Sequence, residues 1–227
     1  MSKYFELHNH SMFSFLDGVG SPTDIVKTAK KLGYEYLAIT DHGEIASWWE
    51  FYSECKEHGI EPILGCEFYI AHDINDREIS PFNKEDMIIK RSHLIVHAKG
   101  NEGVKAVRDL YNNSWTNYAE KNKQIIFEEE LLKCAGKVVV QSACISSYLD
   151  SEEKIKLFKD TFGDDFYLEM QPHKICHDYD MHEKVWNDCE DKQVLHNRKL
   201  IERSVPLQTT AIFCKIDGDL LARLLVS

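Results

Sequence analysis

The sequence predicts an α/β fold, a distorted seven-stranded (β/α) barrel of the TIM-like type. Strand-like and helix-like segments alternate along the 227 residues, which is typical of βαβ units with parallel strands. About seven strands are expected, a number that suits a barrel better than an open sheet. No stretch has the composition of an interdomain linker, so we expect one domain.

The expected strands are short runs of apolar and β-branched residues. The run from Val138 to Val140 is the clearest of them. In chain order, the expected strands are Lys3–Leu7, Tyr36–Thr40, Ile60–Ala71, His93–Ala98, Lys137–Ser142, Asp165–Met170 and Val205–Thr210.

The expected helices lie between these strands. In the first, Ile25, Val26, Ala29 and Leu32 share one face, and a proline in the first turn favours its start. The helices are expected at Pro22–Leu32, Glu44–His58, Glu102–Asn113, Glu128–Cys134 and Glu152–Phe162, with a long charged helix at Asp180–Arg203. The polar stretch Asn75–Asp86 is expected to be an exposed loop.

Composition narrows the classes of function. No apolar run approaches the ~18 residues of a membrane helix, and the N-terminus does not resemble a signal peptide, so we expect a cytoplasmic protein with no membrane partner. The seven cysteines include no C-x-x-C pair, which argues against a disulfide framework or a zinc ribbon. The net charge of −11 predicts weak non-specific binding to nucleic acid unless bound cations change the local field.

Polar side chains follow several of the expected strands. In a barrel of parallel strands, the strand ends form one rim, where active sites lie. Two histidines two residues apart on an extended segment can reach the same metal ion. Clustered carboxylates and imidazoles need shared cations, so the sequence predicts a metal cluster at this rim. The residues concerned are His8, His10, Asp17, Asp41, His42, Glu67 and Cys144.

These motifs resemble one family. The resemblance is carried by His8-Asn9-His10-Ser11, Leu16-Asp17-Gly18, Ala38-Ile39-Thr40-Asp41-His42-Gly43 and Ile63-Leu64-Gly65-Cys66-Glu67, and by shorter matches at Ser92-His93-Leu94, Gln141–Cys144 and Phe162–Glu169. They are similar to the PHP (polymerase and histidinol phosphatase) domain, in the version found at the N-terminus of bacterial-type DNA polymerase III alpha subunits. The resemblance covers roughly residues 4–210 and implies a distorted seven-stranded barrel.

The resemblance also implies a ligand set and a cofactor. The cofactor would be a divalent metal cluster of two or three ions, Zn, Mn or Fe. His93 begins its expected strand, so spacing alone does not select it, and Asp41 is expected to orient a neighbouring histidine. The implied metal ligands are His8, His10, Asp17, His42, Glu67, His93 and Cys144.

The last motif of the family is altered in this chain. The family ends its ligand set with Asp-x-His, whereas Ile212 stands here in place of the Asp and Cys214 in place of the His. Only Cys214 could still bind a metal, as a thiolate. We therefore expect a PHP domain at residues 1–211 and an atypical tail at residues 212–227, explained by truncation or a frameshift. We expect no polymerase domain in this chain and no polymerase activity from it alone.

Three functions are compatible with these residues. The first is a metal-dependent phosphoesterase with 3′–5′ exonuclease chemistry on DNA 3′ ends or another phosphate ester, in which Asp17, His42 and Asp41 are the catalytic candidates. The second is a structural module that docks a polymerase or a proofreading subunit. The third is a small-molecule phosphatase of the histidinol-phosphate type. The loss at Ile212 predicts that metal binding persists while nuclease activity is reduced or absent.

Overall fold

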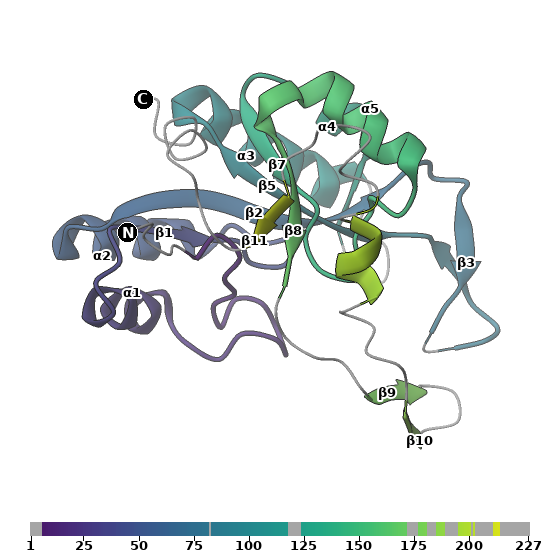
Figure 1. Cartoon of the computed structure of the whole chain (residues 1–227), viewed down its shortest axis with the longest axis horizontal. Helices are drawn as coiled ribbons and strands as arrows, with labels where there is room; N and C mark the ends of the chain where they lie inside the picture. Colours follow the sequence, from purple (N-terminus) through teal and green to yellow (C-terminus); the bar gives the residue numbers. More distant parts are fainter. Residues whose placement is uncertain are drawn as a thin grey trace.

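The computed structural model describes residues 6–81, 83–117, 124–171, 177–180, 185–188, 195–200, 202 and 211–213. The chain forms a curled mixed sheet with helices outside it, resembling half a barrel (Figure 1). The strands of this sheet are β1 (Tyr36–Ile39), β2 (Glu61–Ala71), β5 (Ser92–Ala98), β6 (Ile125–Phe127), β7 (Val138–Gln141), β8 (Phe166–Met170) and β11 (Ala211–Phe213).

The sheet runs in the order β1-β2-β5-β7-β8-β11, and β6 also pairs with β2. The long strand β2 changes partner along its length, because its first residues pair with β1 and its last with β6. Before β1, the segment that begins at Glu6 runs along the outer edge, where the carbonyls of Glu6 and Asn9 accept bonds from Ala38 and Thr40 at 3.1 and 2.9 Å. The α/β class agrees with the prediction, and five of the seven expected strands correspond to β1, β2, β5, β7 and β8. Strand β6 is not among the expected strands, and a closed barrel is not confirmed.

The expectation of parallel strands throughout is wrong for β5. This strand runs antiparallel to both of its neighbours, β2 and β7. The reason is that the chain reaches β5 from β2 through a hairpin, β3 (Arg77–Ile79) with β4 (Met87–Ile89), instead of a crossover helix. A parallel neighbour needs such a crossover. The stretch Asn75–Asp86, expected to be an exposed loop, is mostly exposed among its described residues, but it includes β3 of this hairpin.

Two groups of helices cover the sheet (Figure 1). Helices α1 (Pro22–Lys31) and α2 (Trp48–His58) pack on β1 around Val26, Leu37 and Phe51. The larger core receives side chains from three helices, α3 (Gly100–Asn117), α4 (Glu128–Leu132) and α5 (Glu152–Phe162). The 3-10 turn η1 (Gly163–Asp165) follows α5. A third, small cluster that includes Leu7 and Tyr167 lies apart from both cores. None of the helices among the described residues could span a membrane.

The prediction fails most clearly near the C-terminus. The expected helix Asp180–Arg203 is wrong at its start, where β9 (His177–Asp180) pairs with β10 (Val185–Asp188), and only residues 195–200 and 202 are helical among those described. That prediction relied on charge composition, which does not set a helical period. The expected strand Val205–Thr210 lies outside the described residues, as does most of Lys3–Leu7, but a strand follows at β11.

Candidate metal centre

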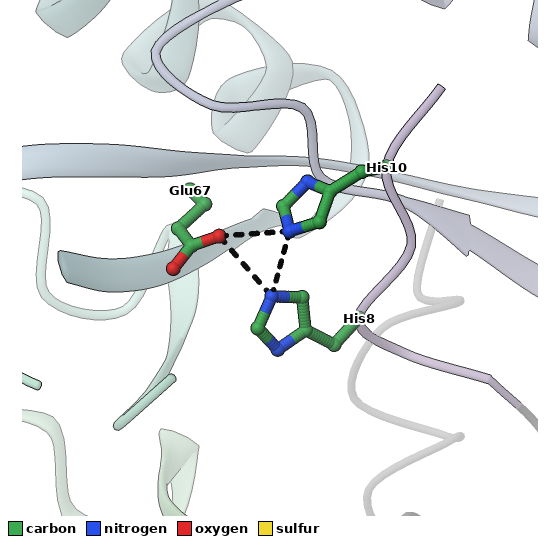
Figure 2. Close-up of side chains that lie close together, drawn as sticks. All are labelled: His8, His10 and Glu67. Carbon is green, nitrogen blue, oxygen red and sulfur yellow. Dashed lines mark hydrogen bonds and ion pairs between the residues drawn. The ribbon is translucent and has the colours of Figure 1, made fainter. Parts of the chain in front are cut away.

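Six polar side chains converge at one rim of the sheet. Three sets of three could each hold a metal ion, since their ligand atoms lie within 4.8 Å of one another. We call His8, His10 and Glu67 the inner group, and Figure 2 shows these three side chains pointing at one another. His10, Asp17 and His42 form the outer group, and His42, Glu67 and His93 form the third group.

The sheet topology explains why residues so far apart in sequence meet here. Glu67 lies in the middle of β2, in the interval between the residues that pair with β1 and those that pair with β6. His42 follows β1 and forms an isolated bridge with Glu67. His93 is near the start of β5. Because β5 runs antiparallel to β2, its start lies beside the end of β2.

The carboxylate of Glu67 is at the centre of the cluster. Its Oε2 lies 3.1 Å from His8 Nε2, 3.0 Å from His10 Nε2 and 3.3 Å from His42 Nδ1. Its Oε1 lies 3.0 Å from His93 Nδ1. Burial by itself raises the pKa of Glu67, but the hydrogen bonds from these histidines outweigh it and hold the pKa well below its usual range.

A second buried carboxylate stands behind His8. Glu169, on β8, lies 2.8 Å from His8 Nδ1 and is 1% exposed. Gln141 and Gln171 also donate to Glu169, at 2.7 and 2.8 Å. Burial lowers the pKa of His8, but the charge of Glu169 outweighs this and the pKa is raised well above its usual value. A carboxylate can only accept, so Nδ1 of His8 carries a proton toward Glu169, while Nε2 faces the cluster.

Glu169 was not selected as a site residue from the sequence. It belongs to the matched segment Phe162–Glu169, but a single Glu in an apolar strand has no partner in the linear pattern. Its signal is burial: an acidic residue within the otherwise apolar stretch Phe166–Met170 needs a cationic or hydrogen-bonding partner. That partner becomes visible only when β8 and the segment containing His8 are placed together.

The outer group is more open to solvent. Asp17 is 53% exposed and lies 3.1 Å from His42 Nε2 and 3.7 Å from His10 Nε2. Burial lowers the pKa of His42 to about 4, so its ring is neutral near pH 7 and can offer a lone pair. Gly18 holds the loop close to the segment before it, because a Cβ there would lie 1.9 Å from the carbonyl oxygen of Ser11.

Cys144 lies at the edge of the cluster. Its Sγ is 3.6 Å from His93 Nδ1 and accepts a bond from the backbone N–H of Ser146 at 3.4 Å. Burial lowers the pKa of His93, but Cys144 and Glu67 outweigh this and raise it to about 9. Cys144 is in none of the three groups, although it directly contacts one of their members.

Asp41 is fully buried beneath the cluster and contacts serines. Its carboxylate accepts bonds from the side chains of Ser11, Ser14 and Ser47 and from the backbone N–H of Ser11. Ser14 in turn contacts His10, so Asp41 reaches this histidine through one hydroxyl group.

The two altered positions follow β8 in the sequence. Ile212 is in β11 and is the register partner of Glu169 in the parallel pair β8–β11. Cys214 lies outside the described residues, so its expected role as a ligand stays a prediction.

The donors converging here fit divalent metal ions. Imidazole nitrogens and carboxylate oxygens suit zinc, manganese and iron. In the inner group, two imidazole nitrogens and a carboxylate oxygen lie within 3.1 Å of one another. If His8 and His10 carry their protons on Nδ1, three lone pairs meet at one point and require a cation between them.

The class of protein is defined by a curled α/β sheet that brings candidate metal ligands together at one rim. Among solved structures, a candidate metal-dependent phosphoesterase from Bifidobacterium adolescentis matches with a TM-score of 0.56, covering 97% of this chain and 94% of that one at 15% identity. A two-domain protein from Bacteroides vulgatus containing a predicted PHP-like metal-dependent phosphoesterase matches with a TM-score of 0.51, over 93% of this chain and 51% of that one, at 15% identity. At these identities, the likeness concerns the fold.

The PHP domain family model matches residues 6–173, and the chain belongs to this family. Among curated proteins, the DNA polymerase III subunit alpha of Borreliella burgdorferi is 36% identical over 186 residues, and that of Aquifex aeolicus is 35% identical over 188 residues. Each alignment covers 77% of this chain but only 16% of the relative. The family prediction made from the motifs is therefore confirmed.

Proposed function

We propose that this chain is a metal-dependent phosphoesterase domain with 3′–5′ exonuclease chemistry on DNA 3′ ends, serving DNA replication. The observation that carries the proposal is the inner group, in which His8 Nε2, His10 Nε2 and Glu67 Oε2 converge within 3.1 Å. Membership of the PHP family supports the reaction class. Similarity to DNA polymerase III alpha subunits supports DNA as the substrate.

The metal cluster would consist of two or three ions, Zn, Mn or Fe, shared among the three groups. The proposed ligands are His8, His10, Asp17, His42, Glu67, His93 and Cys144, with Cys214 as a further candidate. Divalent ions bound here would polarise a phosphate group and make a water molecule more acidic. Because the acidic chain offers few cationic side chains at the rim, these ions would supply most of the positive charge that attracts a phosphate.

The residues of the chain would perform the other tasks. Asp17 and His42 are the catalytic candidates because they belong to the solvent-facing outer group, which a phosphate can reach. His42 has a pKa near 4, so it is neutral at pH 7 and can bind a metal or accept a proton. Asp41 is buried away from solvent and would act through the serine that joins it to His10.

A docking role is the second candidate, favoured by one observation. The altered position Ile212 is the register partner of Glu169, the residue whose carboxylate contacts His8. A domain with a weakened metal centre could still brace a polymerase or bind a proofreading subunit. We accordingly propose that metal binding persists and nuclease activity is reduced.

Elemental analysis and a nuclease assay on the purified chain test these proposals. We expect bound metal, and slow release of the label from a 3′-labelled single strand with Mn²⁺ or Zn²⁺ that disappears in the His8→Ala/His10→Ala variant. The matched control is His58→Ala, which removes a histidine from the surface of α2. Metal without nuclease activity would favour the docking role, and hydrolysis of p-nitrophenyl phosphate alone would favour a small-molecule phosphatase. A chain without metal would refute the phosphoesterase.

A further inference from the structure

One buried serine contacts every member of the outer group. Ser14 is fully buried on the loop between His10 and Asp17. Its Oγ lies 2.7 Å from Asp41 Oδ1, 3.0 Å from the backbone nitrogen of His42 and 3.2 Å from His10 Nδ1. Its carbonyl oxygen accepts bonds from the backbone N–H groups of Asp17 and Gly18, at 2.9 and 3.0 Å.

The direction of each bond follows from counting donors. Asp41 accepts the Ser11 N–H at 2.6 Å on Oδ1, and the hydroxyls of Ser11 and Ser47 at 2.8 and 2.5 Å on Oδ2. Both of its oxygens are thus acceptors, and the single hydroxyl proton of Ser14 goes to Oδ1. The backbone N–H of His42 can only donate, so it occupies one of the two lone pairs on Ser14 Oγ.

The remaining lone pair of Ser14 faces His10. It can only accept, so the proton of His10 in this contact lies on Nδ1. The other ring nitrogen, Nε2, then keeps its lone pair and points at the cluster, 3.0 Å from Glu67 Oε2 and 3.0 Å from His8 Nε2. A hydrogen bond at one ring nitrogen is what decides which nitrogen can bind a metal.

We infer that Ser14 is the positioning residue of the outer metal site. Its hydroxyl fixes the tautomer of His10 and holds the backbone of His42, and its carbonyl holds the turn that bears Asp17. Asp41 supplies the negative charge that orients the hydroxyl. This inference rests on the proposed metal centre. It gives His10 a support at the same ring nitrogen, Nδ1, at which Glu169 contacts His8 directly.

The chain offers a matched control for testing Ser14. Ser11→Ala and Ser14→Ala each remove one hydroxyl bond to the buried Asp41, and both serines are fully buried. Only Ser14→Ala also removes the contacts with His10 and His42. A general loss of stability through Asp41 should therefore be similar in the two variants, whereas a loss specific to the metal site should occur in one.

Titration of the metal-free variants with Mn²⁺, followed by calorimetry, measures this difference. We expect Ser14→Ala to lower the affinity for the ion at the outer group by roughly 10–100-fold, the usual cost of removing a hydrogen-bond partner of a metal ligand. Ser11→Ala should stay within about threefold of the wild type. Ser14→Thr, which keeps the hydroxyl, should recover most of the affinity. Equal losses in Ser14→Ala and Ser11→Ala would overturn the inference.

The tautomer can be read without metal or activity. Nitrogen-15 NMR of the metal-free wild-type protein should show a proton on His10 Nδ1, and this signal should shift or exchange faster in Ser14→Ala. A neutral ring protonated only on Nε2 would overturn the inference even if Ser14→Ala does not fold. If the protein binds metal as expected but hydrolyses no phosphate ester, the proposed function fails while the role of Ser14 stands.

Discussion

The inner and outer groups share His10 but differ in what holds them. In the inner group, the side chains of His8 and Glu67 are 8% and 1% exposed, and Glu169 backs His8 from a neighbouring strand. In the outer group, Asp17 is 53% exposed and comes from a loop. We propose that this difference divides the tasks of the two groups, so that the inner group would hold an ion firmly and the outer group would be open to exchange and to substrate.

The two groups are also held in place by different contacts. Glu67 is fixed by a central strand that pairs on both sides, with β1 and then β6 along one edge and β5 along the other. Asp17 depends on backbone hydrogen bonds within its loop and on the close approach at Gly18. We therefore expect substitutions at the inner group to have larger effects on metal binding than substitutions in the loop.

The largest effect is expected from Glu67→Gln. This carboxylate contacts four histidines and belongs to both the inner and the third group, so its charge would stabilise more than one of the proposed ions. We expect metal affinity to fall by more than the roughly 100-fold that loss of a hydrogen-bond partner behind a ligand can cost. Elemental analysis after dialysis measures this, with Glu61→Gln at the exposed start of the same strand as the control. Unchanged metal content would show that Glu67 is not a ligand.

A large effect on stability is expected from pH, through His97 near the inner group. Burial lowers the pKa of His97 to about 4, below the roughly 6.5 of an unfolded chain. The unfolded state therefore binds this proton first, and the stability present above pH 6.5 should fall as the pH drops towards 4, by on the order of 3 kcal/mol. Urea unfolding of the metal-free protein measures it. His97→Gln should lose this acid sensitivity, and an unaltered pH profile would contradict the assignment.

Glu169→Gln should have an intermediate effect. The variant removes the charge that orients His8 but leaves an amide oxygen that can accept its proton. We expect the affinity of the inner ion to fall by roughly 10–100-fold, with the outer ion less affected. Calorimetric titration with Zn²⁺ separates the two ions. The pKa of His8, which Glu169 raises, should fall in the metal-free variant when followed by NMR. No change in this pKa would argue against the contact.

The smallest effect is expected from Asp17→Asn. The side chain is half exposed, so the free energy of unfolding of the metal-free protein should change by less than about 0.5 kcal/mol. Affinity for the outer ion should fall by about tenfold. The inner ion should remain, because Asp17 is not part of the inner group. The readout is the number of ions retained at limiting Mn²⁺. Equal loss of both ions would erase the distinction between the groups.

The sequence anticipated most of this centre. His8, His10, Asp17, His42 and Glu67 each stand in a short motif, because the family places them directly after strands or within fixed turns. Their convergence could be expected from the rule that parallel strands share one rim. The chain's membership of the PHP family followed from the same motifs, and the family model confirms it.

Other features could be seen only once the strands were placed. The contact between Glu169 and His8 joins residues 161 positions apart, and no local pattern encodes that distance. His93 reaches the rim because β5 runs antiparallel to β2, so that the start of β5 lies there. This direction depends on a hairpin whose strands are only three residues long. Short strands carry too little periodicity to be recognised from sequence.

The sequence by itself thus determined the α/β class, the family and the chemical types at the rim, because these depend on local residue order. The tertiary structure decided how those residues are held. It made the sheet mixed, placed Glu169 against His8, and placed Ser14 between Asp41 and His10. Hydrogen-bond partners across a sheet are set by the register and direction of the strands, and these are properties of the folded chain as a whole.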